Sequence, residues 1–274
     1  MELIVFDLDG TLLNRSAVIS DYTRETLRRL GARGIAYTVA TGRTLHAARS
    51  LLEGHGFHLP QVYKNGVMIW RPDTGTFSHS NYLTLAEVAH VLDAVRSQGI
   101  TPFIFTVEPG DRHAIYHPPL QTDVERRLAA DFSTRAEVAV LPAALMPADA
   151  EITNISALGV PEAIDTIERR IAAEPHLVAY AGEALEGAAF RWIDIHHSNA
   201  SKGAAVDILK ASLGADRVLC FGDSDNDLSM FARADESYAP DNAKPEVKAA
   251  ATAVIGHHDE DGVARFLRQR FDLW

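Results

Sequence analysis

The chain has 274 residues, of which 47% are hydrophobic, and a formal net charge of -11. This hydrophobic fraction is typical of a globular protein, and the length allows one large domain or two smaller ones. The negative charge disfavours nucleic acids and anionic membranes as partners. Apolar runs stay far below the roughly 20 residues that span a bilayer, and the N-terminal residues lack the basic start of a signal peptide. We therefore expect a cytoplasmic protein.

The first 80 residues alternate between short apolar runs and helical patterns. Ser20 and Asp21 can cap a helix that carries Leu27 and Leu30 on one face. A second helix is expected around residues 45–52. Strands are expected at residues 3–6, 35–40 and 62–63. Strand, helix, strand, helix, strand is the pattern of a parallel sheet wrapped by helices.

The middle of the chain has a different pattern. Thr84 can cap an amphipathic helix that ends near Gly99. Further helices are expected at residues 124–132 and 161–173. Strands are expected at residues 102–107, 113–117, 152–158, 177–181 and 190–195. Neighbouring strands with short connections favour a mixed or antiparallel sheet, and hence an α+β module.

The buried α/β pattern returns near residue 198. A helix carries Val206, Leu209 and Leu213, a short apolar strand covers residues 218–221, and a final helix covers residues 263–271. The simplest architecture is an α/β core, a parallel sheet with helices, built from residues 1–82 and 198–274. An α+β domain of residues 83–197 is inserted into it.

Polar segments follow three of the expected strands. Strand 3–6 runs into DLDGT (7–11), strand 35–40 into TGR (41–43), and strand 218–221 into GDSDND (222–227). In open parallel sheets, ligands bind beyond the carboxyl ends of the strands, so these segments are expected to meet at one edge. Aspartates without paired Cys or His residues suit a hard cation, and Mg²⁺ is the natural candidate.

The same residue types favour phosphoryl transfer. Carboxylates about 4 Å apart repel by about 4 kcal/mol at an effective dielectric near 20, so a metal and Lys202 are expected to offset Asp7 and its acidic neighbours. Thr41 and Gly42 stand where a helix begins, so free backbone N–H groups there can hold phosphate oxygens. An aspartate at a strand end is held rigidly and can attack in line.

The polar segments belong to a longer series of short motifs. FDLDGTLL, ATGR, SKG and GDSDND occur in this order, together with KNG, APDNAKPEVKAAA and DEDGVARFL. The chain resembles the haloacid dehalogenase (HAD) superfamily, specifically the Cof-type (subfamily IIB) phosphatases. The resemblance implies a Rossmann-like parallel core with an inserted α+β cap domain, and a phosphoric monoester hydrolase that uses Mg²⁺.

The resemblance also assigns the carboxylates. Asp7 would be the nucleophile that forms an aspartyl-phosphate, and would bind the metal through its other oxygen. Asp9 would be the general acid–base, and its backbone carbonyl would bind Mg²⁺. Asp223 would be a direct metal ligand. Asp227 would hold a metal-bound water or orient Lys202.

Further residues are expected around the phosphoryl group. Thr41, with the backbone of Gly42, and Lys202 would grip its oxygens, and Asn226 would contact it or Lys202. Arg43 is a candidate substrate clamp, but a structural ion pair near the start of the helix is an equal alternative. Asn65 is a candidate near the site, although its Asn-Gly context equally fits a simple turn.

The expected substrate is a small phosphorylated metabolite, such as a sugar phosphate, that is hydrolysed to release phosphate. The alternatives are a phosphomutase or phosphotransferase on the same core, and a catalytically silent metal- or phosphate-binding protein. The inserted domain is expected to set substrate selectivity, with the loops at residues 108–112 and 183–187 as candidates. A monomer is the default expectation, and a homo-oligomer stays open.

Overall fold

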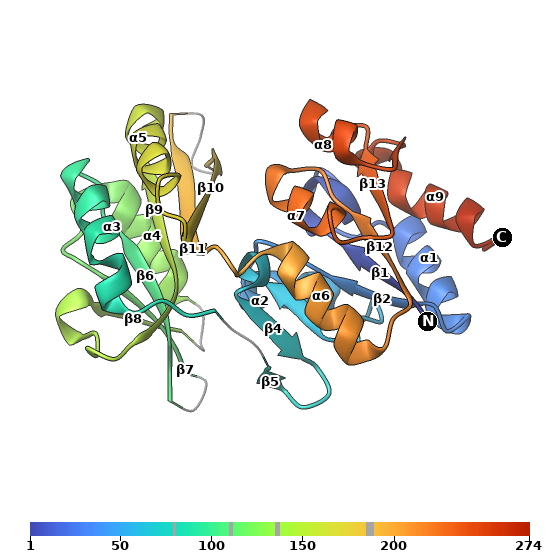
Figure 1. Ribbon diagram of the computed structural model, residues 1–274, viewed down its shortest axis with the longest axis horizontal. Helices are drawn as coiled ribbons and strands as arrows, with labels where there is room; N and C mark the ends of the chain where they lie inside the picture. Colours follow the sequence, from blue (N-terminus) through green and yellow to red (C-terminus); the bar gives the residue numbers. More distant parts are fainter. Residues whose placement is uncertain (79–80, 110–111, 135–137, 185–188) are drawn as a thin grey trace. The chain divides into compact units, whose positions relative to one another are not determined.

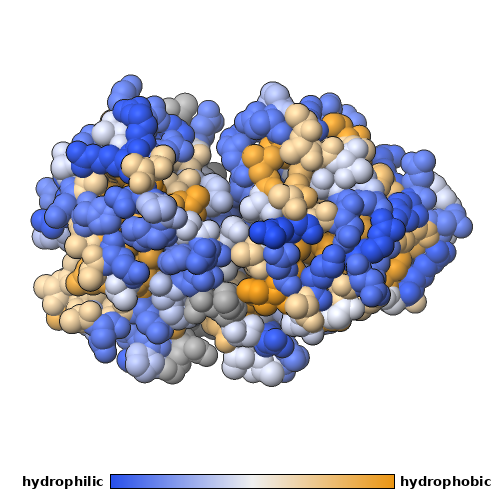
Figure 2. Space-filling view, viewed as in Figure 1, coloured by the Kyte–Doolittle hydropathy of each residue, from blue (hydrophilic) through white to orange (hydrophobic). Residues whose placement is uncertain are grey.

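The computed structural model describes residues 1–78, 81–109, 112–134, 138–184 and 189–274 (Figure 1). The chain divides into two compact units, Met1–His79 with Ala200–Trp274, and Ser80–Asn199. Hydrophilic residues predominate on the face shown in Figure 2, with hydrophobic side chains in scattered patches. None of the described helices is long and apolar enough to cross a membrane.

The first unit contains a five-stranded parallel sheet in the order β14-β13-β12-β1-β2. Its strands are β1 (Glu2–Phe6), β2 (Ala36–Val39), β12 (Arg217–Phe221), β13 (Glu236–Pro240) and β14 (Ala253–Ile255). Phe6 is in register with Val39 on one side and Phe221 on the other. These three strands therefore end at the same level, and the polar segments that follow them start from one edge. The prediction of an α/β fold with a parallel core is confirmed.

Helices cover both faces of this sheet. They are α1 (Asp21–Ala32), α2 (Leu45–Leu52), α6 (Lys202–Leu213), α7 (Leu228–Phe231), α8 (Pro245–Ala250) and α9 (Gly262–Arg270) (Figure 1). On one face, apolar residues of α6, α7 and α8 pack against Val5 of β1 and Cys220 of β12. On the other face α1 contacts α9, and Phe266 of α9 packs edge-on against Phe221. The sheet is therefore the middle of three layers.

Side chains at the helix starts explain why two of these helices begin where they do. The Ser20 hydroxyl accepts a hydrogen bond from the backbone N–H of Thr23 at the start of α1. Ser201 does the same for Ala204 at the start of α6. Each cap satisfies a backbone donor that the helix itself leaves free. The cap on α6 also fixes Lys202 as the first residue of that helix.

One expected strand pairs differently from the prediction. Residues 62–63 lie in β3 (Gln61–Tyr63), which joins the chain after β2 through a parallel bridge between Val62 and Ala40 and is not a strand of the five-stranded sheet. It forms a separate antiparallel sheet with β4 (Met68–Arg71) and β5 (Thr76–Phe77). The reason is the turn Lys64–Gly66, whose residues have positive φ and reverse the chain directly after β3.

The second unit contains a six-stranded sheet in the order β10-β11-β9-β6-β7-β8, in which β7 pairs with β8 in parallel and the other neighbours pair antiparallel. Its strands are β6 (Phe103–Glu108), β7 (Arg112–His117), β8 (Val138–Pro142), β9 (Glu151–Gly159), β10 (Leu177–Glu183) and β11 (Arg191–His197). The helices are α3 (Leu85–Ser97), α4 (Asp123–Ser133) and α5 (Pro161–Ile171). Apolar residues of α3 and α5 share one core with the sheet, and α4 packs through Phe132 against Phe103 and Phe105 in another.

Parts of the two loops expected to face a substrate lie outside the described residues. These parts are residues 110–111 of the loop at 108–112 and residues 185–187 of the loop at 183–187.

Candidate active site

A buried lysine joins two of the strand-end aspartates. The Nζ of Lys202 donates to Oδ1 of Asp7 at 2.5 Å and to Oδ1 of Asp227 at 2.6 Å. Lys202 and Asp227 are fully buried, and Asp7 is 6% exposed. Burial by itself lowers the pKa of an ammonium group, but attraction to Asp227 and Asp7 outweighs it and raises the pKa of Lys202. The lysine therefore stays charged and holds both carboxylates.

Three carboxylates gather around this lysine. Asp7, Asp223 and Asp227 each offer an oxygen, and these oxygens all lie within 4.8 Å of one another. Burial, with repulsion from Asp227 and Asp223, raises the pKa of Asp7 well above its usual range despite Lys202. Burial and the Asp227 charge raise the pKa of Asp223 to about 6. One lysine does not balance three carboxylates, and their oxygens suit a divalent cation of the hard type.

Both carboxylate oxygens of Asp227 accept hydrogen bonds from protein groups. Its Oδ1 accepts from Lys202, and its Oδ2 accepts the backbone N–H groups of Asp223 at 2.9 Å and Ser224 at 3.0 Å. The Asp227 carboxylate thus stabilises the turn that begins at Asp223 and also holds Lys202 in place. Gly222 leaves the space that this requires, because a Cβ there would lie 2.4 Å from Cγ of Asp227.

Asp223 is held against the loop that follows β1. Thr11 Oγ1 donates to Oδ1 of Asp223 at 3.3 Å, and Ser224 Oγ donates to its Oδ2 at 3.3 Å. Gly10 has a φ of +74°, and a Cβ at this position would lie 2.4 Å from Oδ2 of Asp223. Only glycine combines this backbone conformation with so close an approach.

Asn242 is a site residue that the sequence analysis missed. Its Nδ2 donates to the carbonyl of Gly10 at 2.7 Å, and its Oδ1 accepts the backbone N–H of His258 at 3.1 Å. It thereby ties the turn after β1 to the segment after β13. The rule that located the other polar segments would have found it, because Asp241-Asn242 directly follows a parallel strand. That strand was not predicted.

Asn226 and Asn65 meet beside the loop of Thr41 and Gly42. Nδ2 of Asn226 donates to Oδ1 of Asn65 at 2.9 Å, and a Cβ on Gly42 would lie 3.2 Å from that same oxygen. The backbone N–H of Asn65 donates to the carbonyl of Thr41. Asn65 is therefore both a turn residue, with a φ of +55°, and a neighbour of the predicted phosphate loop.

One polar atom of this amide pair is left without a protein hydrogen-bond partner in the part of the chain that the structure describes. Oδ1 of Asn226 is buried and has no hydrogen-bond partner among the described residues. Rotation of both amides by half a turn would preserve the bond to Asn65 and present an N–H of Asn226 in place of this oxygen. Asn226 can therefore offer a buried donor to a ligand.

Asp9 lies apart from the other three aspartates. Both oxygens of its carboxylate accept hydrogen bonds from Arg43, from Nε at 2.7 Å and from Nη2 at 2.7 Å. The Asp9 side chain is 55% exposed. Of the two alternatives for Arg43, the structure contains the ion pair near the start of α2, and the partner is the predicted acid–base.

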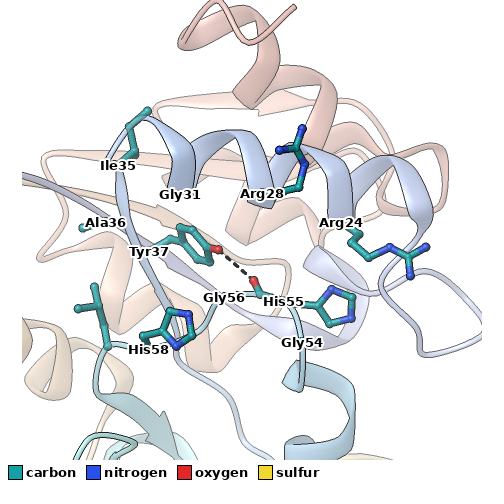
Figure 3. Close-up of a pocket in the computed structure, with 12 residues that line it drawn as sticks. Arg24, Arg28, Gly31, Ile35, Ala36, Tyr37, Gly54, His55, Gly56 and His58 are labelled. Atoms are coloured by element: carbon teal, nitrogen blue, oxygen red, sulfur yellow. Dashed lines mark hydrogen bonds between the residues drawn. The ribbon is translucent and has the colours of Figure 1, made fainter.

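A pocket of about 670 Å³ lies elsewhere in the first unit (Figure 3). It is lined by α1, the beginning of β2 and the segment at residues 54–59, and the hydroxyl of Tyr37 donates there to the carbonyl of His55. Thr41 follows the opposite end of β2, so the pocket is separate from the carboxylates. Its two arginines, Arg24 and Arg28, pair with acidic residues of their own helix, which leaves little charge for an anion.

The fold and the site together define a class: an α/β enzyme core in which strand-end carboxylates and a buried lysine form one polar centre. The family model of the haloacid dehalogenase-like hydrolases matches residues 4–267, and the chain belongs to this family. The predicted family and the predicted class, a phosphoric monoester hydrolase, are thereby confirmed.

Individual relatives cover nearly the whole chain. The 5-amino-6-(5-phospho-D-ribitylamino)uracil phosphatase YwtE of Bacillus subtilis is 30% identical, with 98% of each chain covered. The phosphatase YwpJ of the same organism is 28% identical, with 98% of this chain and 99% of the relative covered. Among solved structures, a haloacid dehalogenase-like hydrolase from B. subtilis has a TM-score of 0.78 at 24% identity, covering 98% of this chain and 99% of that one. The HAD subclass IIB sugar phosphatase BT4131 has a TM-score of 0.76 at 21% identity, with both chains fully covered.

Proposed function

We propose that this protein is a Mg²⁺-dependent phosphatase that hydrolyses a small phosphate monoester through an aspartyl-phosphate on Asp7. The observation that carries the proposal is the buried Lys202, which is hydrogen-bonded to Asp7 and Asp227. A lysine in this position fixes one oxygen of Asp7 and leaves the other for attack on phosphorus. It also brings a positive charge to the place where the phosphoryl oxygens would lie.

Mg²⁺ fits the donor set of this site. Asp7 and Asp223 would be direct ligands, with the backbone carbonyl of Asp9 as a third, and Asp227 would hold a metal-bound water besides orienting Lys202. All of these donors are oxygens, which this ion prefers. The raised pKa values of Asp7 and Asp223 indicate excess negative charge that a divalent cation would offset. When bound, the ion would supply charge stabilisation for the transferring phosphoryl group.

The residues of the chain then divide the reaction between them. Oδ2 of Asp7 attacks phosphorus and the bond to the leaving oxygen breaks, while Asp9, which enters this step in its protonated form, gives that oxygen its proton. Asp9 next takes a proton from the water that hydrolyses the aspartyl-phosphate. Thr41, the backbone N–H of Gly42, and Lys202 hold the phosphoryl oxygens, and Asn226 can add the buried donor described above. Asn65 supports this donor through the bond between the two amides.

The relatives suggest the kind of substrate. YwtE, YitU and YcsE of B. subtilis are all named 5-amino-6-(5-phospho-D-ribitylamino)uracil phosphatases, and BT4131 is named a sugar phosphatase. We therefore propose a phosphorylated sugar, polyol or related metabolite, hydrolysed in the cytoplasm by a monomer. Residues 1–82 and 198–274 would be the catalytic core, and residues 83–197 a cap domain that selects the leaving group.

The test is phosphate release from a panel of substrates. The panel contains 5-amino-6-(5-phospho-D-ribitylamino)uracil, several sugar phosphates and p-nitrophenyl phosphate, each with Mg²⁺ or with excess chelator. The wild type should release phosphate only with the metal, and Asp7→Asn should release none. Asp225→Asn is the matched control, because Asp225 is exposed and pairs with Lys244 on the surface. Conversion of the substrate with all phosphate retained in organic form would favour the phosphomutase alternative and contradict a phosphatase.

A further inference from the structure

The ion pair between Arg43 and Asp9 fixes the orientation of the Asp9 carboxylate as well as its distance from the guanidinium. Nε and Nη2 of the guanidinium each donate to a different oxygen of the carboxylate, both at 2.7 Å. Two parallel hydrogen bonds of this kind set the rotation of the carboxylate as well as its position, which a single bond or a lysine cannot do. In the part of the chain that the structure describes, both side-chain hydrogen bonds of Asp9 come from Arg43.

The other three aspartates are fixed by different means. Asp7 and Asp227 are buried and share Lys202, and Asp223 is held by Thr11 and by a neighbouring serine. Asp9 is 55% exposed, so packing does not select its rotamer. An exposed carboxylate with two rotatable bonds would sample many orientations, and ordering it would cost conformational entropy during the reaction.

Arg43 is itself held by the loop that binds phosphate in the proposed function. Its backbone N–H donates to Thr41 Oγ1 at 3.1 Å, and its carbonyl accepts the N–H of Lys64 at 3.0 Å. Its Nη1 donates to the carbonyl of Ala47 in α2 at 3.3 Å. Arg43 is therefore held both at its backbone and at its guanidinium group. All three guanidinium nitrogens already donate to protein acceptors. This leaves it poorly placed to clamp a substrate.

We propose that Arg43 is a positioning residue that orients Asp9 for proton transfer with the leaving group and takes no part in phosphoryl binding. The proposal rests on the proposed function, since it assumes that Asp9 is the acid–base. It makes the loop after β2 a support for two parts of the site, with Thr41 and Gly42 toward the phosphoryl group and Arg43 toward Asp9.

Substrates with different leaving groups separate this role from the alternatives. An alkyl phosphate needs a proton on its leaving oxygen, whereas p-nitrophenolate leaves without one. The ratio kcat/KM reports the steps up to departure of the leaving group, if that departure is irreversible. Arg43→Gln should lower kcat/KM for an alkyl phosphate at least tenfold more than for p-nitrophenyl phosphate, within the about 10²- to 10⁴-fold that acid–base catalysis contributes. Inhibition by inorganic phosphate should change by less than about twofold, because the phosphoryl contacts are intact.

Two further variants complete the experiment. In the Arg43→Gln background, Asp9→Asn should add little further loss with the alkyl phosphate, because both changes remove one function. Arg43→Lys keeps the charge without the paired hydrogen bonds, so it should show the same leaving-group pattern to a smaller degree, and it carries the test if Arg43→Gln does not fold. Arg28→Gln is the matched control, because Arg28 makes a similar paired contact with Glu25 on the surface of α1.

Three other results would contradict the proposal for Arg43, and each has a different meaning. Equal losses for both substrates, with weaker inhibition by phosphate, would overturn the proposal and make Arg43 a substrate clamp. Unchanged kinetics for Arg43→Gln would overturn it and reduce the contact to a surface ion pair. A wild-type protein that releases phosphate from neither substrate would contradict the proposed function itself, and the proposal for Arg43 with it.

Discussion

The ammonium group of Lys202 lies 2.6 Å from Oδ1 of Asp227, and both side chains are completely buried. A buried pair of this kind adds little net stability, but removal of one partner leaves the other charge without compensation. The contact therefore makes the stability of the core depend on the same charges as the proposed chemistry.

Removal of the lysine should destabilise the metal-free protein. Lys202→Met leaves Asp7 and Asp227 buried and close together with no cation, so the free energy of unfolding should fall by about 3–5 kcal/mol. Urea unfolding with excess chelator measures this loss. The control is Lys248→Met, which breaks a solvent-exposed pair with Asp241 and should cost less than about 1 kcal/mol. A loss for Lys202→Met as small as that of the control would show that the buried charges are not coupled as described.

Two glycine substitutions should separate activity from stability. Gly222→Ala places a Cβ 2.4 Å from Cγ of Asp227, so the carboxylate must move and Lys202 with it. Phosphatase activity should fall at least tenfold if positioning is lost. Gly214→Ala is the counterpart, since Gly214 has positive φ at the end of α6 but open space around it. It should cost about 1 kcal/mol of stability and leave activity intact. Full activity in Gly222→Ala would refute the role of this close approach.

The metal-free core should lose stability as the pH rises. Burial and nearby charge raise the pKa of Asp223 to about 6 and that of Asp7 well above its usual range. A folded-state pKa above the unfolded value of about 3.9 means that the folded protein holds its protons more tightly. The associated stability is complete below the unfolded pKa and is lost as the pH rises through about 6.

The comparison of wild type with Asp223→Asn isolates this effect. With chelator, the unfolding free energy of the wild type should decline relative to the variant between about pH 4 and pH 7, because only the wild type has the Asp223 carboxyl group with its raised pKa. Excess Mg²⁺ should abolish the relative decline by binding the ionised form. Parallel curves for the two proteins in chelator would contradict the raised pKa.

A carboxylate in the second unit should behave in the opposite way. Glu125 is 4% exposed and accepts backbone N–H groups of Thr101, Gln121 and Thr122. Burial opposes ionisation, but these hydrogen bonds outweigh it and lower the pKa of Glu125. Its contribution is therefore present above the unfolded pKa of about 4.3 and is lost as the pH falls through the lowered folded value.

Glu125→Gln should show the size of this contribution. Its amide has a single acceptor oxygen, so at least one buried N–H is left without its partner, at a cost of about 1–3 kcal/mol. Hydrogen exchange of the α4 and β6 amides at neutral pH should detect local destabilisation. The control, Glu87→Gln, lies in the exposed capping box of α3, where glutamine can replace glutamate. Equal exchange in the two variants would argue against a special role for Glu125.

The parts that the sequence predicted best are those fixed by short-range chemistry. Ser20 caps α1 as expected, and the apolar strand that ends at Phe6 leads directly to Asp7. The gathering of Asp7 and Asp223 followed from one rule about parallel sheets. Such features depend on local pattern and on the common direction of the strands, so a single sequence is enough to find them.

The parts that it missed depend on contacts distant in the chain. The antiparallel pairing of β3 with β4 follows from the backbone of the turn at Lys64–Gly66, which an Asn-Gly pair suggests only weakly. The bond between Asn242 and Gly10 spans 232 positions and leaves no trace in residue spacing. The pairing of Arg43 with Asp9 was likewise open, because spacing alone does not distinguish a substrate clamp from an ion pair.

Identification of the residue that carries phosphate during turnover tests whether Asp7 is the nucleophile. The protein is mixed with a substrate and Mg²⁺, quenched during turnover, and treated with borohydride, which reduces an acyl phosphate to an alcohol. The peptides are then mapped by mass spectrometry. The role of Asp7 as nucleophile predicts reduction of Asp7 alone, in the wild type and in the Asp225→Asn control, and no reduction in Asp7→Asn. Modification of another residue, or steady phosphate release by Asp7→Asn, would contradict it.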